Sequence, residues 1–343
     1  MKSDLPALLE LLISGKDLSE QQAEAILQAM AREELSDALA GAILTALRVK
    51  GETGAEIRGF ARGMRNMALR PSIAERSKLV DCVGTGGDGS GSLNLSTGSA
   101  LLAAASGARV AKHGNRAMSS KSGSADVLEA LGFELPVDGH AVAACLDATG
   151  FTFMFAPRFH AATKSVMAVR KSLGVRTVFN LLGPLVNPLS PPYMVVGAYS
   201  LAAARLMAEA LSGMNIERVF VIHGEPGWDE ATPIGPFVRL EVTPAKISER
   251  VIDPLDLGFA RCQSQDLAGG TAAENADALR AVLTGAEQGA HRDALVLGAG
   301  LVLEVCGRAQ SLTDGMKAAS HALENGSAGR LLGRLRDFVM EAA

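Results

Sequence analysis

The first seventy residues follow the apolar and polar alternation of short amphipathic helices. Leucines recur at three- and four-residue spacing in the first of them, at Leu5, Leu8, Leu9 and Leu12. Ser19 and Gln22 form a capping box for a helix over 21–32, and further helices are predicted over 36–49 and 55–68. The stretch has no clustered histidine or cysteine and no glycine-rich loop. We therefore predict a helical bundle over residues 1–70 that serves as scaffold or subunit contact.

From residue 79 onward, short apolar runs alternate with helical patterns. Strands are predicted over 79–83, 108–111, 151–155, 194–198, 219–222 and 237–242, and helices over 96–105, 125–131, 201–211 and 273–283. Residues 293–305 and 313–339 return to helix. The alternation predicts an α/β domain over 76–343 with a mostly parallel central sheet flanked by helices. Ligands of such sheets bind at the carboxyl ends of the strands, where Gly84 and His113 would both lie.

Composition narrows the functional classes. The 343 residues carry a net charge of -4 and are only 4% aromatic, which disfavours a nucleic-acid partner held by bulk electrostatics or stacking. The four cysteines are scattered without metal-ligand spacing, as expected of free thiols in a reducing compartment. The N-terminal stretch lacks the features of a signal peptide, and no apolar run reaches the length of a membrane span. We therefore expect a soluble cytoplasmic protein.

Residues 83–124 are rich in glycine, hydroxyl side chains and cations, and hold no acid after Asp88. Glycines permit positive φ and let an oxyanion approach bare N–H groups, so this composition favours phosphate binding. The glycines at 84, 86 and 89 match a dinucleotide fingerprint, but that motif needs an acid about twenty positions on, where the chain has Arg109. No Walker pattern is present. Two tandem segments, 84–97 and 112–124, predict a ligand with two separate phosphate groups.

Several candidate residues have an ordinary structural explanation as well. Ser96 could cap the following helix, although a helix start is also an anion site. Lys112 and Arg116 could be surface charges, yet their glycine and serine neighbours favour a phosphate cradle. His160 follows an apolar strand and could be structural or functional. An adjacent acid pair, Asp229 and Glu230, could lie in an exposed turn, but carboxylates also suit magnesium.

The chain resembles anthranilate phosphoribosyltransferase over nearly its whole length. The resemblance rests on motifs in the same order: residues 81–124, FAPRFH at 155–160, VRKSLGVRTVFNLLGPLVNP at 169–188 and GWDE at 227–230. It implies transfer of phosphoribose from phosphoribosyl pyrophosphate (PRPP) to the amine of anthranilate in tryptophan biosynthesis, with Mg2+ as cofactor and two ions expected. It also implies a homodimer through the helical domain, to which the segment around 169–188 is joined. No covalent nucleophile is needed, and we assign no general base.

The resemblance assigns site residues position by position. Those expected to contact PRPP are Gly84, Gly87, Asp88, Ser92, Asn94, Ser96, Thr97, Lys112, His113, Gly114, Asn115, Arg116, Ala117, Met118, Ser119, Ser120 and Ser124. Those expected to contact anthranilate are Gly84, Asn115, His160 and Arg170, and the metal ligands are Ser96, Asp229 and Glu230. Arg170 suits the anthranilate carboxylate because a guanidinium is planar and permanently charged. Arg176 competes for that role, but in the family pattern it belongs to a segment near the helical domain.

Two other functions stay open. The segment 224–237 departs from the usual family wording at Trp228, Ala231, Thr232 and Phe237, so a related phosphoribosyltransferase or nucleoside-phosphorylase-like enzyme with another acceptor is an alternative. The retained Asn115 and Arg170 argue against it. A non-catalytic paralogue that binds nucleic acid is a further alternative. The intact motifs and the negative net charge argue against that one.

Overall fold

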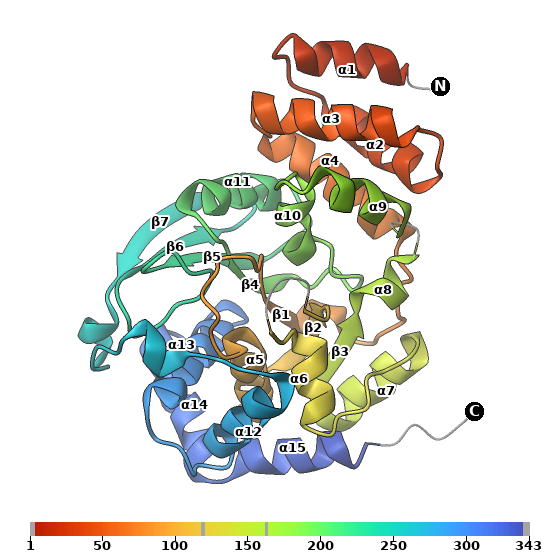
Figure 1. Cartoon of the computed structure of the whole chain (residues 1–343). Coiled ribbons are helices and arrows are strands. Elements are labelled where there is room, and N and C mark those ends of the chain that lie inside the picture. The colour runs from red at the N-terminus through yellow and green to blue at the C-terminus, as the bar shows by residue number, and fades with distance from the viewer. Residues whose placement is uncertain (1–3, 118–120, 162–163, 339–343) are drawn as a thin grey trace.

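The computed structural model describes residues 4–117, 121–161 and 164–338 (Figure 1). Its N-terminal part is the predicted set of helices: α1 (Leu5–Ile13), α2 (Glu20–Ala31), α3 (Asp37–Lys50) and α4 (Gly54–Met67). They stack at one end of the molecule (Figure 1). The capping box is confirmed, because Ser19 accepts from the Gln22 amide and the Gln22 side chain accepts from the Ser19 amide. None of the helices in the described residues is both long and apolar enough to cross a membrane.

A seven-stranded sheet forms the centre of the rest of the chain. Its strands are β1 (Leu79–Gly84), β2 (Arg109–Gly114), β3 (Phe151–Phe155), β4 (Tyr193–Gly197), β5 (Arg218–Gly224), β6 (Phe237–Val242) and β7 (Ile247–Ile252), in the order β3-β2-β1-β4-β5-β6-β7. Strands β1 to β5 pair in parallel, and β6 and β7 are added antiparallel. The predicted fold class is confirmed. The edge strand β7 was not predicted, because its exposed Ile247 and Val251 give it no buried apolar face.

Helices cover both faces of the sheet. They are α5 (Leu95–Ala105), α6 (Ser124–Ala130), α7 (Gly139–Thr149), α8 (Ala156–Phe159), α9 (Lys164–Leu173), α10 (Phe179–Leu182), α11 (Leu201–Ser212), α12 (Ala272–Leu283), α13 (Ala290–Val305), α14 (Leu312–Glu324) and α15 (Ser327–Arg336). Short 3-10 turns lie at Arg76–Lys78, Gly183–Leu185, Pro254–Leu257 and Ser264–Leu267. The single helix expected over 313–339 is two helices, because Gly326 takes a positive φ of 77° between them.

The two largest hydrophobic cores of the described residues sit on opposite sides of the sheet. Helices α5, α12, α13, α14 and α15 pack on one side, in a core that includes Val80 of β1, Leu101 and Leu295. On the other side a continuous core runs from the bundle helices to α10, α11 and the sheet, joining residues such as Phe60 and Val196. The bundle is therefore packed directly against the α/β part rather than tethered to it.

The strand order creates one switch point. From β1 the chain moves outward through β2 and β3, then returns to place β4 on the other side of β1. The loops that leave β1 and β4 therefore diverge, and the crevice between them is where open α/β sheets bind ligands. Gly84 and Gly197 are paired at the carboxyl ends of these two strands.

Candidate active site

Asp229 is packed against the two glycines at the switch point. A β-carbon on Gly84 would lie 2.5 Å from the Asp229 Oδ2 atom, and one on Gly197 would lie 1.7 Å from the Asp229 carbonyl oxygen. Neither position can carry a side chain without moving the acid. The segment after β5 can therefore pack against the ends of β1 and β4 only because both strands have glycine at this point.

The glycine loop after β1 binds the Asp229 carboxylate. The Gly86 amide donates to Oδ2 at 2.6 Å, and the Thr85 hydroxyl lies 3.2 Å from the same oxygen. Asp88 completes the link, because its Oδ2 accepts from the Asp229 amide at 3.2 Å while its Oδ1 accepts from Ser90. The loop glycines at 86, 87, 89 and 91 all take positive φ, between 59° and 76°. This geometry requires glycine and leaves backbone exposed along the loop.

The side chain of Glu230 binds the first turn of α5. Its Oε1 atom accepts from the Ser96 amide at 3.1 Å. A carboxylate is favourable there because unpaired N–H groups and the helix dipole concentrate positive charge at a helix start. The structural alternative for Ser96 is wrong: the helix begins at Leu95 with Asn94 in the cap position, so Ser96 lies inside the first turn.

The acids at this crevice form a cluster with excess negative charge. Burial, followed by the nearby charge of Asp88, raises the pKa of Asp229. Burial and the charge of Asp229 raise the pKa of Glu230 to about 8. The positive charge of Lys112 lowers the pKa of Glu230 and so opposes this effect. Lys112 is 1% exposed and donates to the Cys82 carbonyl. Among the described residues no three His, Cys, Asp or Glu side chains gather as a complete metal site.

The second predicted segment begins at the end of β2. Gly114 is needed there, because a β-carbon would lie 2.3 Å from the Ser124 Oγ atom, and Ser124 itself donates to the Asn115 carbonyl at 3.2 Å. Arg116 pairs with Asp126 and Glu129 on its own side of the loop. Its contact with PRPP therefore stays a prediction. The predicted positions Met118, Ser119 and Ser120 lie outside the described residues.

Asn94 ties the two segments together. Its side-chain amide donates to the Ser122 carbonyl at 3.2 Å, and its Oδ1 accepts from Asn275 at 2.8 Å. Asn275 in turn accepts from the Gly270 amide at 2.6 Å. The helix predicted over 273–283 is α12, which begins one residue earlier. The positioning role of Asn275 was missed, because no motif at that position indicates a partner 181 residues away.

Two histidines lie beneath the crevice. His113 and His160 are buried with ring centroids 5.2 Å apart in an edge-to-face arrangement. Burial lowers the pKa of His113 to about 3 and that of His160 to about 4, so both rings are neutral at physiological pH. The His113 amide donates to Asp81 at 3.4 Å, and Asp81 is held by Asn187 at 2.8 Å.

The two candidate arginines differ in what they contact. The Arg170 guanidinium on α9 lies 5.3 Å from the Phe179 ring centroid, and burial lowers its pKa. No acidic side chain of the described part of the chain pairs with it. Arg176 donates to the Gly87 carbonyl and lies 3.9 Å from the Tyr199 ring centroid. The segment it belongs to does pack against the helical domain, where the Phe179 ring centroid lies 6.0 Å from that of Phe60. The Arg176 guanidinium itself reaches the glycine loop.

Comparison with known proteins defines the class to which this fold and crevice belong. The family described as "Glycosyl transferase family, a/b domain" matches residues 76–329, and "Glycosyl transferase family, helical bundle domain" matches residues 6–68. Both parts of the chain thus match those of one glycosyl transferase class.

Individual relatives narrow that class. The anthranilate phosphoribosyltransferase of Desulforudis audaxviator is 45% identical over 332 residues, covering 96% of this chain and 95% of the relative. That of Rubrobacter xylanophilus is 46% identical over 326 residues, with 95% and 94% covered. The crystal structure of the Thermus thermophilus enzyme superposes with a TM-score of 0.89 at 42% identity, covering 96% of this chain and 98% of that one. The chain therefore belongs to the anthranilate phosphoribosyltransferase family.

A more distant structure carries ligands. The Saccharomyces cerevisiae anthranilate phosphoribosyltransferase in complex with PRPP and Mg has a TM-score of 0.87 at 26% identity, with 98% of each chain covered. The same yeast enzyme has also been solved in complex with 4-fluoroanthranilate, at a TM-score of 0.87 and 25% identity.

Proposed function

We propose that this protein transfers the 5-phosphoribosyl group of PRPP to the amine of anthranilate, releasing pyrophosphate, in tryptophan biosynthesis. The observation that carries the proposal is the acid pair Asp229 and Glu230, attached through hydrogen bonds to a phosphate-type glycine loop and to a helix start at the switch point. Two carboxylates in this position would repel a phosphate group unless a cation lay between the acids and the phosphate. PRPP is an anion that is bound together with one.

The glycine loop and the segment after β2 are the proposed PRPP site. Positive φ at Gly86, Gly87 and Gly89 turns successive peptide groups so that N–H donors can face one ligand. The cross-link through Asn94 holds the second segment at a fixed distance from the first. We propose that one segment binds the pyrophosphate and the other the 5-phosphate, with the assigned residues between them.

The acid cluster fits a magnesium ion. Magnesium is bound in proteins by one or two carboxylates together with substrate phosphates. Glu230 and Asp229 carry raised pKa values because negative charge is buried without enough compensation, and a divalent cation would supply that compensation. When bound, the ion would neutralise charge on the departing pyrophosphate. We propose Ser96, Asp229 and Glu230 as its protein ligands, with two ions per site.

Anthranilate is proposed to bind between Asn115 and Arg170. Arg170 is a partly desolvated guanidinium without an acidic partner in the described residues, so a substrate carboxylate would satisfy it with two parallel hydrogen bonds. The amine would then attack C1 of the ribose as the pyrophosphate leaves, through a state with oxocarbenium character. The chain's contribution is to align the two substrates and to hold charge near the leaving group.

One experiment tests the assignment. When the protein is mixed with anthranilate, PRPP and magnesium, the fluorescence signal of anthranilate should fall as that substrate is consumed. Changing Asp229→Asn together with Glu230→Gln should lower the rate by about 100-fold or more and raise the magnesium requirement. The matched control is Glu225→Gln, an exposed acid of the same segment, which should leave both unchanged. No reaction in the wild type would reject the activity, whereas an active double variant would reject only the metal ligands.

We also propose a division into a bundle over 1–70 and an α/β domain over 76–343, with the bundle forming a homodimer contact. Support comes from two exposed apolar side chains on bundle helices, Ile13 at 64% and Val49 at 82%. Light scattering on the wild type and on Val49→Glu would measure the oligomeric state. We place the protein in the cytoplasm, which agrees with four cysteines that form no disulfide.

A further inference from the structure

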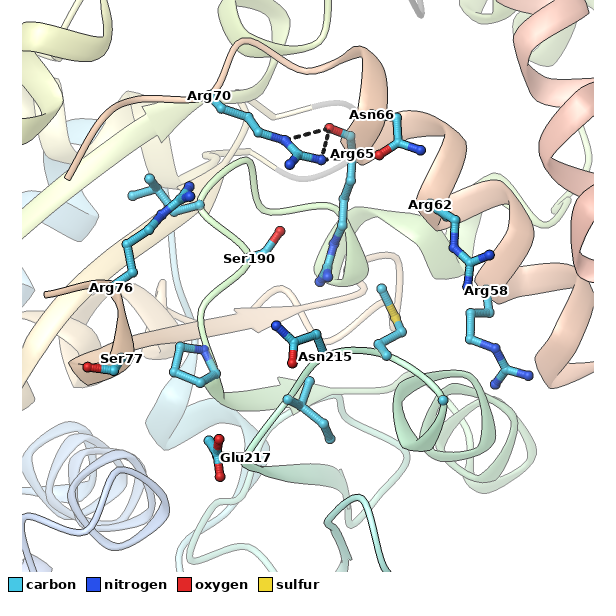
Figure 2. Close-up of a pocket in the computed structure, with 15 residues that line it drawn as sticks. Arg58, Arg62, Arg65, Asn66, Arg70, Arg76, Ser77, Ser190, Asn215 and Glu217 are labelled. Carbon is cyan, nitrogen blue, oxygen red and sulfur yellow. Dashed lines mark hydrogen bonds between the residues drawn. The ribbon is translucent and has the colours of Figure 1, made fainter. Parts of the chain in front are cut away.

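A cavity lies at the end of the sheet away from the glycine loop. Figure 2 shows the residues that line it. Its volume is about 580 Å³. It is lined by Ser77, Pro192 and Glu217, each of which lies just before a parallel strand. The cavity therefore sits at the amino-terminal ends of β1, β4 and β5. Its other wall is the bundle helix α4 and the chain that follows it (Figure 2). The cavity is therefore separate from the crevice described above.

Five arginines line this cavity against one acid. They are Arg58, Arg62, Arg65, Arg70 and Arg76, and the acid is Glu217. Glu20 of α2 pairs with Arg58 and Arg62 and accounts for those two. No acid of the described ranges pairs with the other three. Arg70 donates to the Arg65 carbonyl and to Asn66. Like charges brought together in this way favour an anion between them.

Arg65 adds an independent observation. The residue is only 7% exposed, and its Nε atom donates to the Leu185 carbonyl at 2.7 Å. Its Nη2 atom is buried and has no hydrogen-bond partner. Figure 2 shows the side chain extending from α4 into the cavity, toward Ser190 and Asn215. A buried guanidinium nitrogen without an acceptor is costly, and the cost is removed when a ligand oxygen reaches it.

Electrostatics at Arg65 agree with this geometry. Burial, and then the charge of Arg70, lower its pKa to about 10. Both effects disfavour the charged form of this guanidinium. An anion would reverse them, because opposite charge within a few ångströms favours the ionised form.

We propose that this cavity binds a small polyanion bearing a phosphate or pyrophosphate group, held by Arg65, Arg70 and Arg76. Its volume is that of a small-molecule site, and guanidinium groups match the oxygens of such groups in bidentate fashion. A linear acidic peptide is the less suitable ligand, because the unpaired Arg65 nitrogen lies at the buried end of the cavity rather than on a surface track. The bound ligand would join the bundle helix α4 to the loops before β4 and β5.

Titration calorimetry with inorganic pyrophosphate, in buffer free of magnesium, tests the site. The pocket variant is Arg70→Gln with Arg76→Gln, two exposed residues away from the catalytic crevice. The control is Lys246→Gln with Arg250→Gln, which removes the same charge from exposed positions on and beside the edge strand β7. The pocket variant should bind one pyrophosphate fewer per chain, or bind the ligand about tenfold more weakly. The control should bind as the wild type does.

Further measurements separate the alternatives. The KM for PRPP should be the same in the pocket variant and the wild type, which locates the lost binding outside the catalytic site. A wild-type crystal soaked in pyrophosphate should show the ligand on the Arg65 guanidinium. Unchanged binding by the pocket variant, equal losses in both variants, or density in the catalytic crevice only would each overturn the proposal. Tighter binding of a hexa-aspartate peptide than of pyrophosphate would overturn the assignment to a small ligand.

Discussion

The α-carbon of Gly84 faces the carboxylate of Asp229 so closely that a β-carbon there would lie 2.5 Å from Oδ2. The neighbouring Gly86 amide donates to the same oxygen at 2.6 Å. The end of β1 thus fixes the position of an acid that lies 145 residues further along the chain. The glycine at position 84 is required by the acid, in addition to any ligand that approaches the loop.

Replacing Gly84 with alanine should therefore displace the Asp229 carboxylate. A shift of about 1 Å in a positioning group can cost roughly 100-fold in rate, so we expect kcat/KM to fall by about 10- to 100-fold and the magnesium requirement to rise. The measurements are initial rates across a magnesium series. The matched control is Gly333→Ala on α15, where the added carbon would have no atom within 4 Å beyond its chain neighbours and the backbone of its own helix. That variant should keep full activity and gain up to about 1 kcal/mol in stability, and an equally active Gly84→Ala enzyme would refute the positioning argument.

Arg170→Gln should separate the two substrates kinetically. Loss of a charge-assisted pair to a carboxylate is worth about 1.5–3 kcal/mol, so the KM for anthranilate should rise by roughly tenfold or more, while that for PRPP changes little. Steady-state kinetics with each substrate varied in turn provide the test. Lys171→Gln, the exposed neighbour on the same helix, is the control. A larger effect on PRPP than on anthranilate would mean that Arg170 lies at the other end of the site.

Local signals predicted most of the fold. The strands expected at 151–155 and 237–242 match β3 and β6 in full, and the buried apolar runs of β1, β4 and β5 differ from prediction by one or two residues at an end. These segments are buried, so their hydrophobic pattern reports directly on their structure. The glycine loop was predictable for a similar reason, since its positive φ angles demand glycine.

Interactions between distant segments were not predictable in this way. Arg176 lies on the glycine loop through a contact to Gly87, 89 residues away in sequence, and nothing local to the arginine indicates that partner. Asn275 supports Asn94 across 181 residues. Lys112 sits in a segment that looks like a surface cradle, yet the pairing of β2 with β1 and β3 buries it. Tertiary packing decides these positions.

Asn187 shows how much stability such a distant link can carry. Its side-chain amide donates to the buried Asp81 carboxylate and to the Ala111 carbonyl, each at 2.8 Å. Asn187→Ala should leave both acceptors buried without this donor and reduce the free energy of unfolding by about 2–4 kcal/mol. Urea unfolding measures the change, with Gln21→Ala on the exposed side of α2 as a control expected to stay within about 0.5 kcal/mol. A loss of similar size in both variants would remove the special role of Asn187.

Magnesium should stabilise the protein more at high pH than at low pH. Without a bound cation the folded chain keeps the Glu230 proton up to about pH 8, whereas the unfolded chain releases it at about pH 4. Between these values the folded chain holds more protons, so the free energy of unfolding falls as pH rises through this window. A cation bound to the ionised acids opposes that loss, and its stabilising effect therefore grows over the same window.

Thermal unfolding with and without magnesium, at about pH 6 and about pH 8.5, measures this linkage. The gain in Tm on adding magnesium should be larger by a few degrees at the higher pH. In the variant carrying Asp229→Asn and Glu230→Gln, both the gain and its pH dependence should disappear, because neutral amides neither titrate in this range nor hold the ion as carboxylates do. Equal gains at the two pH values in the wild type would show that magnesium does not bind by displacing these protons, and the acid pair would then need another role.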